Sequence, residues 1–166
     1  MMSPNKKESQ KHKFMNRFQK SGLIVVILLI VAVISVIVVN TNDMEKISIT
    51  FQNNAIINAE VAVDLKDQVI GLSGRESLDP DSGMLFVYES EDIRNFWMRG
   101  MNFPIDIIWI KDDTVVGFEE NVPMPGNSDE IARVSSDVAV DMVLEVSAGF
   151  CAKNSLVVGD SLDIDL

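Results

Sequence analysis

The residues best suited to chemistry are two carboxylates embedded in apolar segments. Asp106 lies within residues 105–110 (IDIIWI), and Glu145 lies within residues 142–146 (MVLEV). A carboxylate in an apolar strand is costly unless it is paired or hydrogen-bonded. The arginines that could pair with it beyond residue 40 are few, and Arg75 is one of them. We therefore expect Asp106 and Glu145 to belong to a buried ion pair or to a specific polar site.

Three interpretations of these carboxylates stay open at the level of sequence. In the first, they form salt bridges that lock the fold. In the second, they belong to a ligand pocket in which Arg75 holds an anion and Trp97 forms one wall. In the third, they are the acid and base of a hydrolase acting on a glycan, which requires both in one cleft about 5–10 Å apart.

The other side chains exclude several common kinds of catalytic site. His12 is the single histidine and Cys151 the single cysteine. Because His12 precedes the apolar run described below, no histidine can pair with a serine or cysteine in the rest of the chain. The same shortage argues against zinc. Met98 and Met101 could offer thioethers to a soft cation, but we interpret them as core residues, and we expect no metal and no cofactor.

An unbroken apolar run over residues 22–39 is the strongest indication of where the protein works. As a helix, the run would span roughly 27 Å, close to the thickness of a bilayer's hydrocarbon core. The residues before it are basic, which predicts that the N-terminus stays in the cytoplasm. The run is longer than a signal-peptide core and lacks a small-x-small cleavage site, so we favour an uncleaved anchor over a cleaved secretory signal.

This orientation predicts four segments. They are a basic cytoplasmic tail (1–21), a transmembrane anchor (22–39), a juxtamembrane linker (40–45) and an extracytoplasmic domain (46–166). We therefore expect a single-pass protein of the cytoplasmic membrane, with the lipid bilayer as partner of residues 22–39 and the domain in the periplasm or outside the cell. Of the chain's 14 basic and 25 acidic residues, the tail holds six and one, which leaves a formal charge of −16 on the rest. Such a domain repels phosphate backbones, so we expect no nucleic-acid partner.

The hydrophobic pattern beyond residue 46 is mostly that of β-strands. Apolar residues alternate with polar ones over 47–51, 60–65 and 162–166, and we expect Val61, Val63 and Leu65 to be buried. Continuous apolar runs at 84–88, 95–98, 105–110, 114–118 and 142–146 indicate more deeply buried strands. Short helices are expected within 67–75 and 148–153, and a loop over 123–127. We predict one mainly-β α+β domain with an antiparallel sheet curled around one core.

A series of motifs also follows a distinctive order. They are Gly71-Leu72, Arg75, Leu78, Gly83-Met84-Leu85-Phe86, Phe96-Trp97-Met98, Pro104-Ile105-Asp106-Ile107, Leu144-Glu145, Gly149 and Gly159-Asp160. This order resembles the domain of unknown function 192 family over most of the chain beyond Ile47. The resemblance implies a small, mainly-β, partly open barrel-like domain, often exported or membrane-anchored, with no established activity.

The same resemblance marks a set of typical positions and two departures from them. The typical positions are Arg75, Trp97, Met98, Asp106 and Glu145. Ser73 stands where the family usually has methionine, and Gly100-Met101 stands where it usually has a polar pair. A site that used those groups would have a different ligand here.

Together, these observations favour a binding module over an enzyme. We predict that the domain binds a small polar ligand or an envelope component, and the five typical residues named above are the candidates either for binding this ligand or for locking the fold. A structural or interaction subunit of a membrane complex is the second interpretation, and a carboxylate-dependent hydrolase is the third.

Overall fold

The computed structural model describes residues 26, 29–30, 44–126 and 130–166, and residues 44–166 form one compact unit. Several predicted segments lie wholly or partly outside the described residues: the tail, most of the anchor, residues 40–43 of the linker and the last residue of the 123–127 loop. In the described part of the chain, no helix is both long and apolar enough to cross a membrane.

The described part of the domain is mainly β, with nine strands and two short helices. They are β1 (Lys46–Phe51), β2 (Ile56–Ala62), α2 (Leu65–Ile70), β3 (Ser82–Asp92), β4 (Asn95–Trp97), β5 (Ile105–Lys111), β6 (Thr114–Val122), β7 (Arg133–Ser135), β8 (Val140–Ser147), α3 (Phe150–Asn154) and β9 (Leu162–Ile164). The short strand β7 has no counterpart in the prediction, because its three residues carry no clear apolar pattern.

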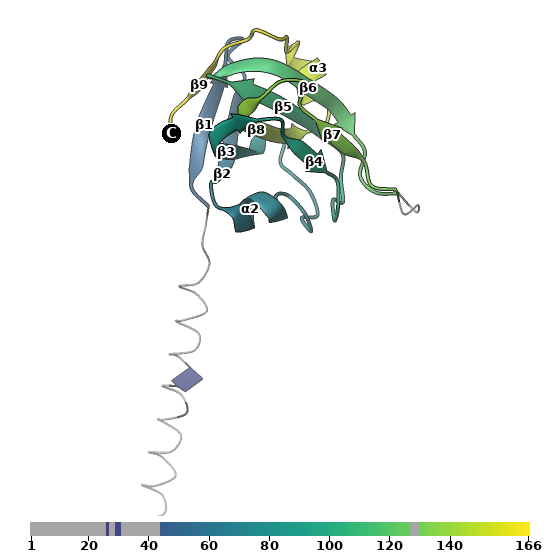
Figure 1. The fold of residues 1–166 in the computed structure, drawn as a ribbon. Coiled ribbons are helices and arrows are strands. Elements are labelled where there is room, and N and C mark those ends of the chain that lie inside the picture. Colours follow the sequence, from purple (N-terminus) through teal and green to yellow (C-terminus); the bar gives the residue numbers. More distant parts are fainter. Residues whose placement is uncertain (1–25, 27–28, 31–43, 127–129) are drawn as a thin grey trace, which may run out of the picture. The chain divides into compact units, whose positions relative to one another are not determined.

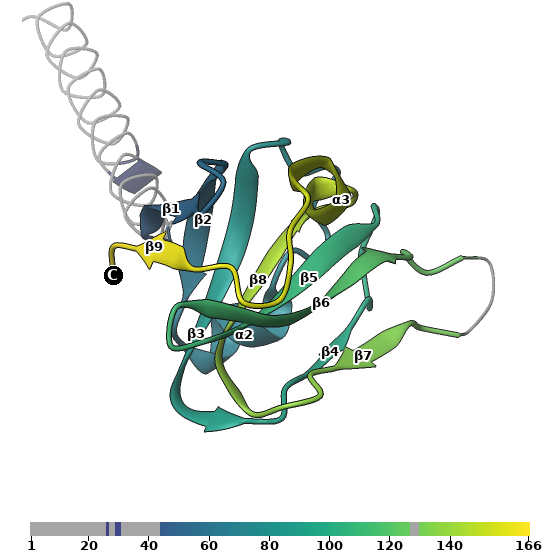
Figure 2. The same cartoon turned by 90° about the horizontal axis from the view of Figure 1, so that it is seen from above.

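Seven strands form one curled, half-barrel sheet in the order β6-β5-β8-β3-β2-β1-β9, and β4 and β7 form a separate ribbon (Figures 1 and 2). The segment before β9 partly closes the curl. The Val115 N–H donates to Asp160 O at 2.9 Å, and the Gln52 N–H donates to Ser161 O at 3.0 Å. One segment therefore bonds both to the start of β6 and to the end of β1.

One strand pair departs from the predicted antiparallel sheet. β2 and β3 are parallel, and parallel neighbours need a crossover connection, which here contains α2. The Asp64 carboxylate caps this helix by accepting the Asp67 N–H at 2.9 Å. Because β2 ends at Ala62, Val63 and Leu65 are 68% and 76% exposed, so the prediction that they are buried was wrong.

The core lies on both faces of the sheet rather than in the single layer that we predicted. β3, β5 and β8 are central strands covered on both faces, which explains their continuous apolar runs. We call the side that contains Phe150 and Cys151 of helix α3 the α3 layer; it includes Ile108, Leu144 and Val146. The α2 layer, on the opposite face, includes Leu72, Met84, Phe86, Met98, Ile107 and Trp109.

Candidate functional site

Asp106 and Glu145 lie on neighbouring strands, but on opposite faces of the sheet. Across β5 and β8, Glu145 is paired with Ile107, and Asp106 is paired with Val146. Paired residues share a face, and successive residues alternate between faces. Glu145 therefore faces the α2 layer and Asp106 the α3 layer. The two carboxylates share no cleft, and the acid–base pair considered for a hydrolase is not formed.

Asp106 is fully buried and holds backbone donors in place. Its Oδ1 accepts the N–H of Asn121 at 2.8 Å and of Gly149 at 3.1 Å, and its Oδ2 accepts the N–H of Cys151 at 2.9 Å. These bonds tie β6 and α3 to β5, so Asp106 locks the fold through hydrogen bonds to the backbone. Burial and the adjacent Asp106 carboxylate raise the pKa of the Cys151 thiol, which makes this cysteine an unreactive core residue.

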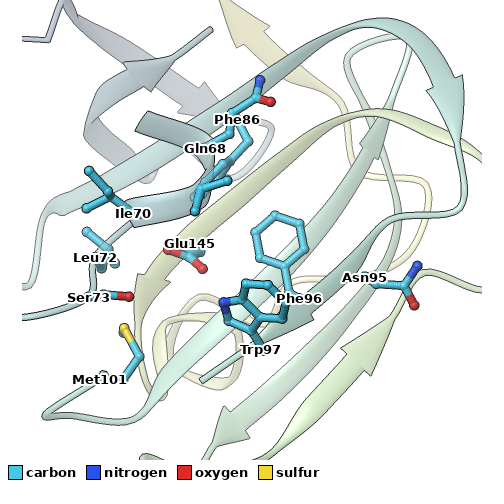
Figure 3. A pocket seen from close by; sticks show the side chains of 12 residues that line it. Gln68, Ile70, Leu72, Ser73, Phe86, Asn95, Phe96, Trp97, Met101 and Glu145 are labelled. Atoms are coloured by element: carbon cyan, nitrogen blue, oxygen red, sulfur yellow. The ribbon is translucent and has the colours of Figure 1, made fainter. Parts of the chain in front are cut away.

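Glu145 lies in a pocket on the other face. The residue is 6% exposed, and its Oε2 is buried without a hydrogen-bond partner. The pocket encloses about 180 Å³, and its wall combines α2, the turn after α2, β3 and β4. Figure 3 shows the carboxylate among the labelled side chains, between Leu72 and Trp97. The lining residues are Gln68, Val69, Ile70, Gly71, Leu72, Ser73, Phe86, Asn95, Phe96, Trp97, Met101 and Glu145.

Two turns joined by hydrogen bonds build one side of the pocket. Gly71 ends α2 with φ 52°, and the turn that it begins meets the turn at 99–102. The Gly74 N–H donates to Gly100 O at 2.8 Å, and the Ser73 hydroxyl donates to Arg99 O at 2.8 Å. The Asn102 amide donates to the backbone oxygen of Arg75 at 2.8 Å. This network positions Ser73 and Met101 in the wall.

Gly71 also keeps space open above the carboxylate. A Cβ atom at this position would lie 3.4 Å from Phe86 Cζ and 3.7 Å from Glu145 Oε2. A side chain here would therefore occupy the space next to the unpartnered oxygen. The positive φ would strain any such residue as well.

The protonation of Glu145 depends mainly on its burial. Loss of water raises the pKa of this carboxyl to about 8, while the nearby Arg75 charge lowers it. Arg75 itself is not one of the lining residues. Its two terminal nitrogens donate to Glu60 Oε1 and Oε2 at 3.0 and 2.6 Å. This pairing raises the pKa of Arg75 and lowers that of Glu60, so Arg75 serves as half of an ion pair rather than as the anticipated anion clamp.

The remaining predicted residues take different places around the pocket. Trp97 lines it and is 48% exposed, with the guanidinium carbon of Arg99 5.3 Å from its ring centre. Met98 is buried in the α2 layer and does not line the pocket, whereas Met101 does. Within the described residues, no cluster of three or more acidic, histidine or cysteine side chains could hold a metal ion.

Sequence reasoning missed Glu60, Gln68 and the phenylalanines of the wall. Glu60 looked like an ordinary exposed residue of an alternating strand. Gln68 anchors α2 by donating from its amide nitrogen to Val87 O at 2.9 Å, and to Ala62 O and Val63 O at 3.3 Å each. The Gly83–Phe86 motif was a signal that could have led to Phe86, because Met84 of this motif pairs with Glu145 across β3 and β8.

The sequence profile of the DUF192 family, described as "Uncharacterized ACR", matches residues 47–164. The chain belongs to this family. No curated protein matches the chain.

Two crystal structures of other proteins share the fold of this chain. The first is of a "putative transcription regulator" from Sinorhizobium meliloti 1021, with 28% identity and a TM-score of 0.65, and covers 74% of this chain and 95% of the other. The second is of a protein of unknown function from Novosphingobium aromaticivorans DSM 12444, with 23% identity and a TM-score of 0.63, and covers 75% and 89% of the two chains.

The two expected departures from the usual DUF192 pattern lie in or next to the pocket wall. Ser73 and Met101 both line the Glu145 pocket, and Gly100 lies against Ser73, since a Cβ on it would be 3.3 Å from that residue's Cβ. Two of the three residues at which the sequence was expected to depart from the family pattern therefore line the pocket, and the third, Gly100, lies next to Ser73.

Proposed function

We propose that this protein is a membrane-tethered, extracytoplasmic binding module that holds a small polar ligand, or part of an envelope component, in the Glu145 pocket. The observation that carries the proposal is the buried Glu145 Oε2 without a hydrogen-bond partner. Buried polar atoms are nearly always partnered, and leaving one unpaired costs about 1–3 kcal/mol. A ligand that reaches the carboxyl would supply the missing partner.

The form of the pocket also supports binding. Small-molecule sites combine apolar walls with a few polar groups that fix the ligand's orientation. Here three aromatic residues, Phe86, Phe96 and Trp97, surround one buried carboxyl. The volume of about 180 Å³ lies below the usual range of roughly 300–1,000 Å³ for such sites, which favours a small ligand or one protruding group of a larger molecule.

The proposed tether is supported by the apolar run at 22–39 and the basic residues that precede it. Carbonate extraction of membranes should leave the full chain in the membrane fraction. Protease added to spheroplasts should remove the domain and leave the N-terminal tail intact. Release of the chain by carbonate, or protection of the domain, would contradict the tether.

Binding is tested on the full chain in neutral detergent micelles. Small ions, sugars and peptidoglycan fragments are screened for a rise in melting temperature with wild type, Glu145→Gln and Glu89→Gln. Glu89 is an exposed glutamate of β3 and therefore a matched control. We expect a ligand that stabilises wild type and the control, but stabilises Glu145→Gln less. Equal shifts in all three proteins would count against the pocket.

A role as an interaction subunit is the second candidate, and the surface of α2 favours it. Leu65 and Val69 lie one turn apart and are both largely exposed, and none of the six residues of α2 is buried. A partner helix or lipid could cover them. Affinity capture from solubilised membranes tests this role, with the double variant Leu65→Ser/Val69→Ser as control: a partner that is retained by wild type and lost by the variant would support it.

The charge of this chain argues against a role in DNA binding such as the description of the Sinorhizobium protein suggests. The formal net charge of this chain is −11, and DNA binding depends on neutralising phosphates with lysine and arginine.

A further inference from the structure

We infer that the ligand of the Glu145 pocket is a small organic cation, with an alkylammonium group held between the Glu145 carboxylate and the aromatic rings of the wall. This inference rests on the proposed function, because it names the ligand class of the same site. Three features of the pocket support a cation: the hydrogen bonds that its polar side chains already make, its aromatic rings, and the charges around Glu145.

Two of the four pocket-lining side chains that carry hydrogen-bond donors already use them within the protein. The Gln68 amide nitrogen donates to three backbone oxygens, and the Ser73 hydroxyl donates to Arg99 O. Arg75, the cation that influences Glu145, donates to both oxygens of Glu60. The other donors on the described lining side chains, those of Asn95 and Trp97, are neutral, so an anion would find no positive charge in the pocket wall. A ligand that brings its own positive charge would find the free acceptor Oε2 of Glu145.

The rings of the wall favour a cation over a neutral apolar group. The faces of tryptophan and phenylalanine rings carry negative charge density and attract ammonium groups within about 6 Å. Phe86 and Phe96 meet edge to face, with ring centres 5.0 Å apart and planes at 89°. Trp97 completes this side of the pocket next to Phe96 (Figure 3). Several aromatic rings gathered around one site are the arrangement that recognises quaternary ammonium groups.

The groups facing Glu145 leave its charge largely uncompensated. Its neighbours in register are Met84 on β3 and Ile107 on β5, and both are uncharged. Arg75 acts on Glu145 from the turn after α2, but its charge is offset by Glu60 on β2. On β3, Tyr88 feels the Glu145 charge, but its own pKa is raised to about 12, so it stays neutral at physiological pH. A bound cation would be the main counter-charge.

Binding should then depend on pH in one direction. A permanent cation binds best when Glu145 is ionised, and burial holds the pKa of this carboxyl at about 8 in the unliganded protein. Below pH 8, each increase of one pH unit should raise the affinity for such a cation about tenfold. Above pH 8 the affinity should level off. A neutral ligand of the same shape should show no such rise.

The experiment compares choline with its uncharged carbon analogue 3,3-dimethyl-1-butanol, using the full chain in neutral detergent micelles. Calorimetric titrations at pH 5.5, 6.5, 7.5 and 8.5 give dissociation constants for wild type, Glu145→Gln and the control Glu89→Gln. We expect choline to bind wild type and the control at least tenfold more tightly than the alcohol at pH 8.5. That preference should shrink toward low pH and be lost in Glu145→Gln.

The outcomes separate this inference from the proposed function. Equal affinity for choline and the alcohol, or a choline affinity that does not change with pH, would overturn the inference while leaving a binding pocket. Butyrate is the anionic probe in the same titrations, and tighter binding of butyrate than of choline would also overturn the inference and indicate an anionic ligand. If none of the three probes binds, and the broader screen described above also finds nothing, the proposed function fails with the inference.

Discussion

Asp106 on β5 and Glu145 on β8 are diagonal neighbours that face opposite sides of one sheet. Asp106 accepts three backbone N–H groups, whereas Oε2 of Glu145 accepts none. Two carboxylates in similar sequence contexts therefore have different roles. Asp106 holds β6 and α3 to β5, whereas Glu145 has a buried oxygen without a hydrogen-bond partner in a pocket.

The first prediction concerns the pH dependence of stability. The pKa of Glu145 is about 8 in the folded protein and near 4.5 in the unfolded chain, so the folded state binds more protons between these values. Its stability therefore falls as pH rises through this window, by about 1.4 kcal/mol for each pH unit. Glutamine does not titrate, so Glu145→Gln should gain about 2–3 kcal/mol relative to wild type between pH 5.5 and 7.5.

Urea unfolding followed by tryptophan fluorescence measures this difference at several pH values. The other titrating groups are common to both proteins, so the difference between the two curves isolates Glu145. Parallel curves for wild type and Glu145→Gln would show that Glu145 is not held protonated.

Asp106→Asn should destabilise the domain without changing the pocket. Asparagine replaces one acceptor oxygen with an NH₂ group, so at least one of the N–H groups of Asn121, Gly149 or Cys151 would face another donor. We expect a loss of about 2–4 kcal/mol in the free energy of unfolding. Asp163→Asn, at an exposed position of β9, should change it by less than about 0.5 kcal/mol.

Ligand affinity provides the second readout for Asp106→Asn. Under conditions in which the variant is folded, its affinity for choline should equal that of wild type, because Asp106 faces the α3 layer. A large loss of affinity in the folded variant would mean that the two faces of the sheet are coupled.

Trp97→Leu tests the aromatic wall. Trp97 is half exposed, so leucine should cost little stability, but it removes the ring face that attracts a cation. We expect choline affinity to fall at least threefold, and affinity for 3,3-dimethyl-1-butanol to change less. Titrations of both probes at pH 8.5 measure the effect, and an equal loss for both would indicate simple apolar contact.

Much of the fold could be predicted because hydrophobic patterning is local. The runs that became β3, β5 and β8 are apolar without interruption, since both faces of these strands are covered. The direction of pairing was harder, because nothing in the 60–65 pattern shows that the strand ends at Ala62. Asp64 caps the start of α2 just after this point, and the crossover through α2 allows β3 to lie parallel to β2.

The site could be predicted only in part, for a physical reason. Patterning showed that Asp106 and Glu145 are buried, but the face each occupies depends on pairing register, and a shift of one residue reverses it. The pairing of Arg75 with Glu60 could not be predicted either, because it depends on how the turn after α2 packs beside β2. The aromatic wall comes from two separate strands, β3 and β4, which only the folded chain brings together.

Gly83→Ala tests the close packing of β3 against β8. A Cβ at Gly83 would lie 2.8 Å from the backbone oxygen of Glu145 and 3.0 Å from Ile57 Cγ2. A backbone atom cannot move aside cheaply, so we expect a loss of about 1–3 kcal/mol in the free energy of unfolding. Gly126→Ala is the matched control, because no atom of the described residues beyond its chain neighbours lies within 4 Å of its added Cβ. Equal stabilities of the two variants would contradict the packing of these strands.

The last prediction tests whether Glu60 controls Glu145 through Arg75. Glu60→Gln removes the negative charge that offsets Arg75, so the unbalanced guanidinium should lower the pKa of Glu145 from its value of about 8. Arg75→Met should have the opposite effect, because it removes the charge that already lowers this pKa. Carbon-13 NMR of labelled glutamate side chains measures both shifts. Since Arg75 and Glu60 are only partly buried, neither change should unfold the domain. If the pKa of Glu145 shifts in the same direction in both variants, the ion pair acts on Glu145 through packing rather than charge. Shifts in opposite directions would establish Glu60 as a remote regulator of the pH at which the pocket accepts a cation.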